Sequence, residues 1–233
     1  MSPKRRVLLT SLIFAALGVS VSLGIIASGG GFGSGASIFN PPTDKDVYHV
    51  GQGIHNGTAL TYNLDSVGPN SSLKSAKVSM VFHDTGKDWR TAVSVTNASS
   101  PTKQETLNFS RQLTIEGEVP KDFRPYYEPV KSSILNVLDM SFNGGQPKYF
   151  VIGAPWDTLI YGSSYTTIRV TGKEDVTTPA GTFNAFVLSY QLQNQTSKIW
   201  FPHDAPFPVK AQVFDQQDQP LYSYQLLSNK TES

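Results

Sequence analysis

Hydrophobic and polar residues alternate along much of the chain after residue 58. In the run 77–83 the apolar residues are Val78, Met80 and Phe82, and the run 88–97 repeats this pattern. A period of two is typical of strands that bury one face. An Asp-Thr-Gly-Lys turn sequence separates the two runs, so they predict a β-hairpin.

The same pattern continues to the C-terminus, with Gly, Pro and Asn-rich turns between the runs. Consecutive runs joined by short turns predict a β-meander in the C-terminal half. The predicted strands are 59–64, 77–83, 88–97, 105–117, 148–153, 164–175, 183–193, 197–201, 209–215 and 221–227.

A different period occurs between residues 125 and 141. Val130, Ile134, Val137 and Leu138 are spaced at i, i+4, i+7 and i+8, and Pro129 lies near the start. This spacing predicts one helix, whose apolar stripe we expect to cover the sheet, although such a stripe could also bind a partner. The expected fold is mainly β: a curved antiparallel sheet or half-open β-barrel with one covering helix.

The N-terminus has the composition of a membrane anchor. The 21 residues from 7 to 27 include no charged side chain. Three cationic residues precede this stretch, and the next Lys or Arg after it is Lys45. A stretch of this length spans a bilayer as a helix, and the charge bias places the N-terminus in the cytoplasm. We therefore expect a cytoplasmic tail at 1–6, a transmembrane anchor at 7–27, a Gly-rich tether at 28–40 and an extracytoplasmic β-rich domain at 41–228. A signal peptide cleaved near Ala27 is the alternative, and it would give a secreted protein.

Glycosylation sequons also predict export. Six of the eleven asparagines stand in Asn-x-Ser/Thr, which marks surface sites of exported glycoproteins. They are Asn56, Asn70, Asn97, Asn108, Asn194 and Asn229. The chain has no cysteine, whereas exported eukaryotic domains often use disulfides. An archaeal cell envelope is thus the expected setting, with a bacterial one second.

Charge argues against nucleic-acid binding. Three of the 19 basic residues lie in the N-terminal tail, which leaves 16 against 18 acidic residues and a formal charge of −2 for the remainder. No stretch has the Lys/Arg clusters with interleaved aromatics that bind a phosphate backbone.

Candidate catalytic residues gather near the C-terminus, in the segment 200–214. His203, Asp204 and Lys210 lie there among three prolines, but no nucleophile stands beside them, so the segment predicts a stiff corner between two strands. Glu174 and Asp175 are adjacent on a predicted strand and should face opposite sides. We expect neither an enzyme nor a cofactor.

The histidines give no metal signature. His49, His55, His83 and His203 lack the spacing of a metal site. A metal site or a catalytic triad assembled from distant residues stays open.

The segment 170–227 resembles a known family. It contains G-x-E-x-V-x-x-P-A-G-T-F at 172–183, then a strand ending in Trp and a Pro-Val-Lys sequence. This is similar to a family of uncharacterised exported bacterial and archaeal domains related to the half-barrel lipoprotein carriers. The resemblance implies a curved sheet that encloses a lipid or another hydrophobic ligand, and it implies no catalytic residues.

Two functions follow as alternatives. In the first, the domain binds a hydrophobic ligand in the cell envelope, in a groove lined by Trp156, Trp200, Phe207 and Tyr224. In the second, it is a structural or adhesive glycoprotein of the envelope or surface layer, without a small ligand. The expected partners are the membrane, through the N-terminal helix, and other envelope proteins.

Overall fold

The computed structural model describes residues 42–68, 73–97, 100–138, 148–161 and 164–231. The chain divides into two units, Met1–Pro41 and Pro42–Ser233, and the described residues all belong to the second. The predicted tail, anchor and tether lie outside them. In the described part, no helix is both long and apolar enough to cross a membrane.

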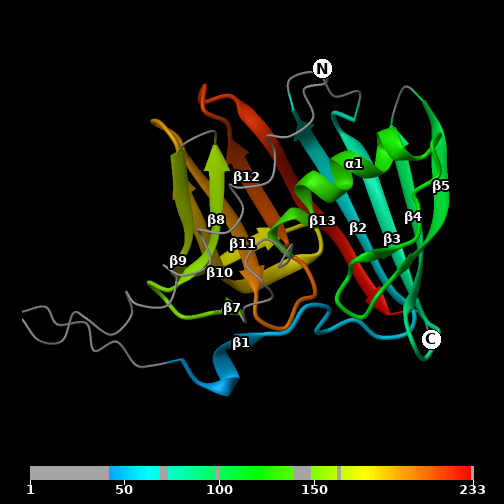
Figure 1. Cartoon of the computed structure of the whole chain (residues 1–233), viewed down its shortest axis with the longest axis horizontal. Coiled ribbons are helices and arrows are strands. Elements are labelled where there is room, and N and C mark those ends of the chain that lie inside the picture. Colours follow the sequence, from blue (N-terminus) through cyan, green and yellow to red (C-terminus); the bar gives the residue numbers. More distant parts are fainter. Residues whose placement is uncertain (1–41, 69–72, 98–99, 139–147, 162–163, 232–233) are drawn as a thin grey trace, which may run out of the picture. The chain divides into compact units, whose positions relative to one another are not determined.

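Thirteen strands and one α-helix make up the described residues (Figure 1). The short elements are the 3-10 helices η1 (Asp44–Asp46) and η2 (Asn136–Leu138) and the strands β1 (Val47–Tyr48), β6 (Ile115–Glu116) and β7 (Lys148–Tyr149). The longer ones are β2 (Thr58–Val67), β3 (Ala76–Asp84), β4 (Trp89–Asn97), β5 (Ser100–Phe109), α1 (Arg124–Ser133), β8 (Pro155–Tyr161), β9 (Ser164–Thr178), β10 (Gly181–Gln191), β11 (Thr196–Pro202), β12 (Lys210–Phe214) and β13 (Pro220–Thr231).

Eleven strands form one antiparallel sheet in the order β6-β5-β4-β3-β2-β13-β12-β11-β10-β9-β8. Strands β8 to β13 pair with their sequence neighbours, which is the predicted meander. β6 and β8 are the two edges, so the sheet is open rather than closed into a barrel. The prediction of a mainly β fold with an open antiparallel sheet and a helix is confirmed for the described residues.

The alternation in the sequence becomes the two faces of this sheet. In β3, Ala76, Val78, Met80 and Phe82 are buried, while the residues between them are exposed or half-buried. β4 pairs with β3 as the predicted hairpin, and its buried residues follow the same rule. The buried side chains therefore share one face, which is how a one-sided core forms.

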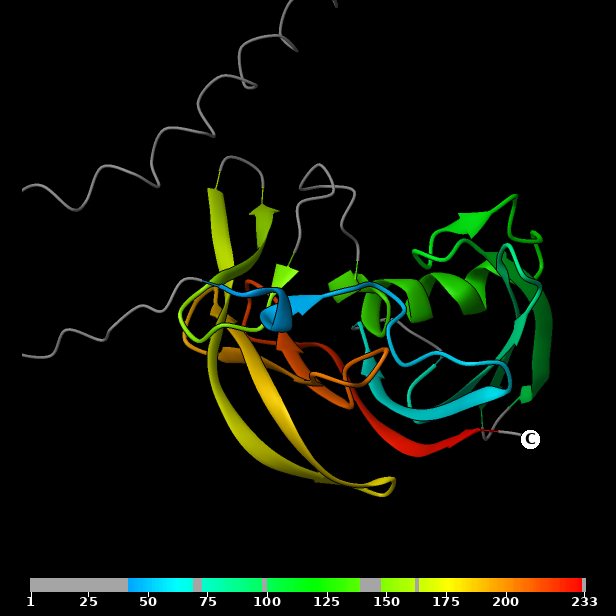
Figure 2. The same ribbon diagram turned by 90° about the horizontal axis from the view of Figure 1, so that it is seen from below.

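The buried face is concave, and α1 lies against it (Figure 2). The ring of Tyr127 in α1 lies 6.5 Å from that of Phe109 in β5. Val130 and Ile134 are also buried. The helix thus covers the part of the sheet nearest β5, as its apolar stripe predicted.

The helix is shorter than predicted. It ends at Ser133, and Val137 and Leu138 lie in η2 rather than in the same helix. The Ser133 hydroxyl donates to the Pro129 carbonyl at 2.6 Å. Pro129 lacks an amide hydrogen, and a serine bonded back to the preceding turn bends a helix, so both features favour an early end.

Two strand predictions need correction. The predicted strand 105–117 is two strands, because a turn between Ser110 and Thr114 separates β5 from β6. Leu113 takes a positive φ of 59° there, and the Ser110 hydroxyl accepts from the amide of Thr114 at 3.2 Å. The predicted strand 148–153 is only β7, which pairs with β1 as a separate sheet. The strands β1 and β8 were not predicted from the sequence.

Candidate functional site

The four aromatic residues predicted to line a groove are all buried. Trp156, Phe207 and Tyr224 are 1–3% exposed and Trp200 is 8% exposed. Trp156 belongs to an aromatic cluster, Phe207 stacks on Phe82 at 5.9 Å, and Tyr224 contacts Tyr62. Tyr48 and Tyr62, which contact Trp156 and Tyr224, both bind the segment that carries Phe207, so three of the four residues lie in adjoining parts of the core.

The aromatic cluster consists of Tyr48, Phe150, Trp156 and Phe201. All six pairs of ring centroids are 4.9–5.7 Å apart, within the range in which aromatic rings attract one another. The Trp156 indole nitrogen donates to the Val137 carbonyl at 3.2 Å. The polar tip of this tryptophan is thus bound by the protein itself.

A buried ion pair lies beside this cluster. The Lys148 ammonium is 3.1 Å from the Asp157 carboxylate, and their side chains are 3% and 13% exposed. The ammonium also donates to the Trp156 carbonyl at 2.8 Å. The sequence did not predict this ion pair, because nine positions separate the two residues and their spacing matches no known motif.

The segment 203–209, which joins β11 to β12, is called the strap, and its prolines at 206 and 208 are buried. Tyr48 donates its hydroxyl to the Pro206 carbonyl at 3.0 Å, and Tyr62 donates to the Pro208 carbonyl at 3.2 Å. Phe207, between these two prolines, is the residue that stacks on Phe82. Burial raises the pKa of Tyr48 and Tyr62, so both phenols stay neutral donors at any physiological pH. Their hydrogen bonds hold the strap in place.

Two buried hydroxyls among the described residues have no hydrogen-bond partner. They belong to Tyr224 in β13 and Thr91 in β4. The Tyr224 ring is buried, and its centroid lies 5.7 Å from that of Tyr62 and 6.1 Å from that of Tyr222. Desolvation raises the pKa of the Tyr224 hydroxyl well above its ordinary value. A buried hydroxyl without a partner is uncommon and indicates a place where water or a ligand group could bind.

Trp200 lies on the face of the sheet opposite to Phe201, its neighbour in β11. Its indole nitrogen donates to the Glu174 carboxylate at 2.6 Å, and the ammoniums of Lys198 and Lys210 lie 5.9 Å and 5.4 Å from its ring centre. Asp175 instead accepts from the Asn184 amide at 2.7 Å. The two adjacent carboxylates thus have separate partners, as the strand geometry predicted.

The mixture of His203, Asp204 and Lys210 does not assemble into a catalytic site. Lys210 lies over the Trp200 ring. The His203 ring contacts Asp204 at 2.8 Å and the Lys45 carbonyl at 3.0 Å. The other three histidines, His49, His55 and His83, are exposed. No group of His, Asp or Glu among the described residues could hold a metal ion.

The sequons differ in how their amides are used. Asn70 lies outside the described residues, and Asn97 is half-buried, whereas Asn56, Asn108, Asn194 and Asn229 are exposed. The Asn194 side chain donates to the Asp218 carboxylate at 2.8 Å. Its amide nitrogen, the atom that a glycan would modify, is thus already engaged.

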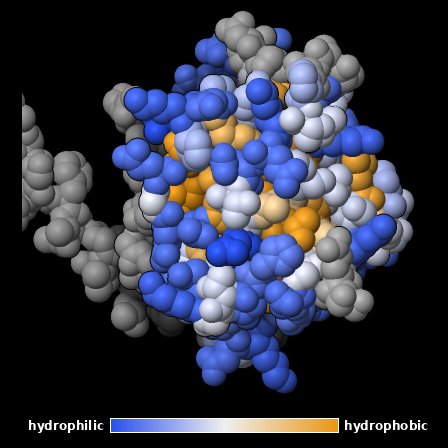
Figure 3. Space-filling model, turned by 90° about the vertical axis from the view of Figure 1, so that its right-hand side faces the viewer, coloured by the Kyte–Doolittle hydropathy of each residue, from blue (hydrophilic) through white to orange (hydrophobic). Residues whose placement is uncertain are grey.

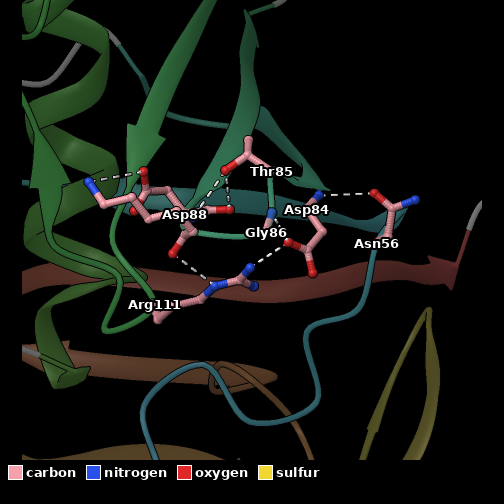
Figure 4. A network of polar contacts seen from close by, with 7 residues as sticks. Asn56, Asp84, Thr85, Gly86, Asp88 and Arg111 are labelled. Atoms are coloured by element: carbon pink, nitrogen blue, oxygen red, sulfur yellow. Dashed lines mark hydrogen bonds and ion pairs between the residues drawn. The ribbon is translucent and has the colours of Figure 1, made fainter.

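Asn56 belongs to a polar network around the β3–β4 turn (Figure 4). Its side-chain oxygen accepts from the Asp84 amide at 2.9 Å, and the Arg111 guanidinium binds the Asp84 carboxylate. The Arg111 guanidinium also lies over the Trp89 ring, with its central carbon 4.2 Å from the ring centroid. The hydrogen bond from Arg111 is the main reason why the pKa of Asp84 is lowered.

A shallow cavity of about 110 Å³ lies at the β5–β6 edge of the sheet. Its lining residues are mostly polar and include Asn108. They are Thr106, Leu107, Asn108, Ile115, Glu116, Glu118 and Pro120.

No protein-family model and no curated protein matches the chain. Among solved structures, a crystal structure of MucB is similar, with a TM-score of 0.41 and 11% identity. The match covers 77% of this chain and 54% of the MucB chain, so it spans about half of MucB. A likeness of this size says nothing about activity. The resemblance of the segment 170–227 to exported half-barrel domains stays a prediction.

Proposed function

We propose that the chain is a membrane-tethered, extracytoplasmic structural domain of the cell envelope. The observation that carries this proposal is how the aromatic residues are used. The indole nitrogens of Trp156 and Trp200 donate to Val137 and Glu174, and the ring of Phe207 stacks on Phe82. Side chains bound in this way stabilise a fold and leave little for a ligand to contact.

The location is supported by the sequence and by the exposure of the sequons. Residues 7–27 are uncharged and follow three cations. Four sequon asparagines, Asn56, Asn108, Asn194 and Asn229, have exposed side chains, as glycan acceptors on an exported protein need. A polar, glycan-bearing domain on a short tether suits contact with other envelope components.

Protease treatment of intact cells tests the location. A protease added outside should remove residues 42–233 from the full chain while a cytoplasmic marker stays intact. Protection of this domain in intact cells, with digestion only after lysis, would contradict an extracytoplasmic position. N-terminal sequencing of the untreated protein separates an uncleaved anchor from a cleaved signal peptide.

A carrier of a hydrophobic ligand is the second candidate, and two observations favour it. The Tyr224 hydroxyl is buried and has no hydrogen-bond partner among the described residues. On the side of the molecule that carries β5, hydrophobic side chains reach the surface between hydrophilic ones (Figure 3). A ligand entering there would have to displace α1 or the strap, since the core beneath them is packed.

Solvent extraction of the purified full chain tests the carrier. A carrier yields a stoichiometric lipid in mass spectrometry, and a Tyr224→Phe variant yields less of it because the polar anchor is gone. A structural domain yields no stoichiometric lipid from either protein.

A further inference from the structure

Strands β9 to β12 gather positive charge on one face of the sheet. Trp200 pairs directly with Lys210 and follows Lys198 by two residues, so these three side chains share a face. Arg169 joins them, because Ser189 in β10 pairs with both Arg169 and Lys198. We call this side of β9 to β12 the Trp200 face, and it carries three cations.

Few negative charges balance these cations. The only carboxylates in β9 to β12 are those of Glu174 and Asp175. The Glu174 carboxylate lies on the Trp200 face, where it accepts from the indole nitrogen at 2.6 Å. Asp175 lies on the opposite face and binds the Asn184 amide. The Trp200 face of these four strands therefore has three cations and one carboxylate.

The two lysines are held near each other without an ion pair. Their ammoniums lie over the same indole ring, at 5.9 Å from its centre for Lys198 and 5.4 Å for Lys210. Within the described part of the chain, neither ammonium pairs with a carboxylate. Trp200 is buried and bound to Glu174, so the ring that attracts both cations is fixed in place. Two ammoniums positioned in this way can bind neighbouring negative groups of one ligand.

The surroundings of the two lysines are polar and uncharged. Gln212 pairs with Lys198 and is exposed, and Gln225 pairs with Lys210 and is half-buried. Among the described residues of β10 to β13, no large hydrophobic side chain is exposed. Side-chain amides bind the hydroxyls of sugars, and ammoniums bind carboxylates. A surface that enters a lipid bilayer instead needs exposed apolar side chains, so this composition favours an acidic sugar polymer over a membrane.

We propose that the Trp200 face binds a polysaccharide that carries carboxylate groups, such as a polymer of uronic acids. Lys198 and Lys210 bind the carboxylates, and Gln212 and Gln225 bind the sugar hydroxyls. The inference rests on the proposed structural role in the cell envelope, and it names the class of component that the domain contacts there.

Calorimetric titration of the purified full chain with polygalacturonate tests this proposal. The polymer should bind at low salt, and binding should weaken as the salt concentration rises, because exposed charges are screened. Dextran, a polysaccharide without charge, should not bind. A double variant, Lys198→Gln with Lys210→Gln, should weaken the binding of polygalacturonate about tenfold, because two hydrogen bonds between charged groups are lost.

A matched control removes two positive charges elsewhere. Lys173 lies over the Phe186 ring at 4.8 Å on the opposite face of the same strands, and Lys121 is exposed outside the sheet. Lys173→Gln with Lys121→Gln should bind polygalacturonate as the natural protein does. Equal losses in the two double variants, equal binding of dextran, or binding only to vesicles that contain phosphatidylglycerol would overturn the proposal.

A measurement on the natural protein covers the case in which the lysine variant fails to fold. Polygalacturonate should protect Lys198 and Lys210 from chemical acetylation and leave Lys173 reactive. Equal protection of all three lysines, or of none, contradicts the proposal.

The ligand and the location of the domain are tested separately. A domain that a protease reaches from outside the cell, but that does not bind polygalacturonate, would refute the polysaccharide site alone. A domain that stays protected in intact cells would refute the envelope position, whatever the purified chain binds.

Discussion

The hydroxyl of Tyr62 donates to the Pro208 carbonyl, whereas the hydroxyl of Tyr224, whose ring lies 5.7 Å from that of Tyr62, has no partner. Both rings are almost completely buried. The pair therefore separates the effect of a satisfied phenol from that of an unsatisfied one, in the same part of the core.

Removing each hydroxyl should have a different effect. Tyr62→Phe should lower the free energy of unfolding by about 1 kcal/mol, because it leaves the Pro208 carbonyl without its donor. Tyr224→Phe should be neutral or slightly stabilising, because no hydrogen bond is lost. Urea unfolding of the full chain measures both, and an equal loss in the two variants would mean that Tyr224 has a partner in solution.

Breaking the buried ion pair between Lys148 and Asp157 should lower the free energy of unfolding by more than the loss of one neutral hydrogen bond. Asp157→Asn removes the negative charge that faces the buried Lys148 ammonium, so we expect a loss of about 3 kcal/mol. Asp88→Asn is the control, because its partner Lys87 is 85% exposed and 3.9 Å away. Exposed pairs contribute little. Similar losses in both variants would contradict the importance of burial at Lys148.

The Arg111–Asp84 contact predicts a pH effect with a definite sign. The pKa of Asp84 is lower in the folded chain than in the unfolded chain, so its stabilising contribution is present above the ordinary carboxyl range and is lost as the pH falls through the folded pKa. Arg111→Met should raise the pKa of Asp84. Carboxyl NMR titration measures this change, and Asp218, whose lowered pKa comes mainly from the Gln195 amide, should not move. An unchanged Asp84 titration would exclude Arg111 as the cause.

The sequons should differ in tolerance to a glycan. The side-chain and backbone amides of Asn194 both donate to the Asp218 carboxylate. A glycan on the Asn194 side chain would compete with the side-chain hydrogen bond and weaken this turn. Asn108 is exposed on β5 and should carry a glycan without loss of stability. Glycopeptide mass spectrometry of the exported protein should find higher occupancy at Asn108 than at Asn194. Equal occupancy in a protein of unchanged stability would contradict the role of Asp218.

Local patterns predicted much of the fold, because the period of two along β3 and β4 depends only on which side chains face the core. The break between β5 and β6 depends on a positive φ at Leu113, a position where glycine or asparagine is usual, so the sequence did not signal it.

The candidate site was harder to predict. The hydroxyls of Tyr48 and Tyr62 bind carbonyls 158 and 146 positions away. Their partners are backbone atoms, which leave no trace in residue type. The contacts that Trp156, Trp200, Phe207 and Tyr224 make follow from the sheet order, which short motifs do not determine.

Native mass spectrometry of the full chain, released from its own membranes, tests the central proposal most directly. A structural envelope domain should appear at the mass of the protein with its glycans, without a stoichiometric lipid. A bound acyl-chain molecule in a one-to-one ratio, retained by the natural protein and reduced in Tyr224→Phe, would contradict the structural role and establish the carrier instead.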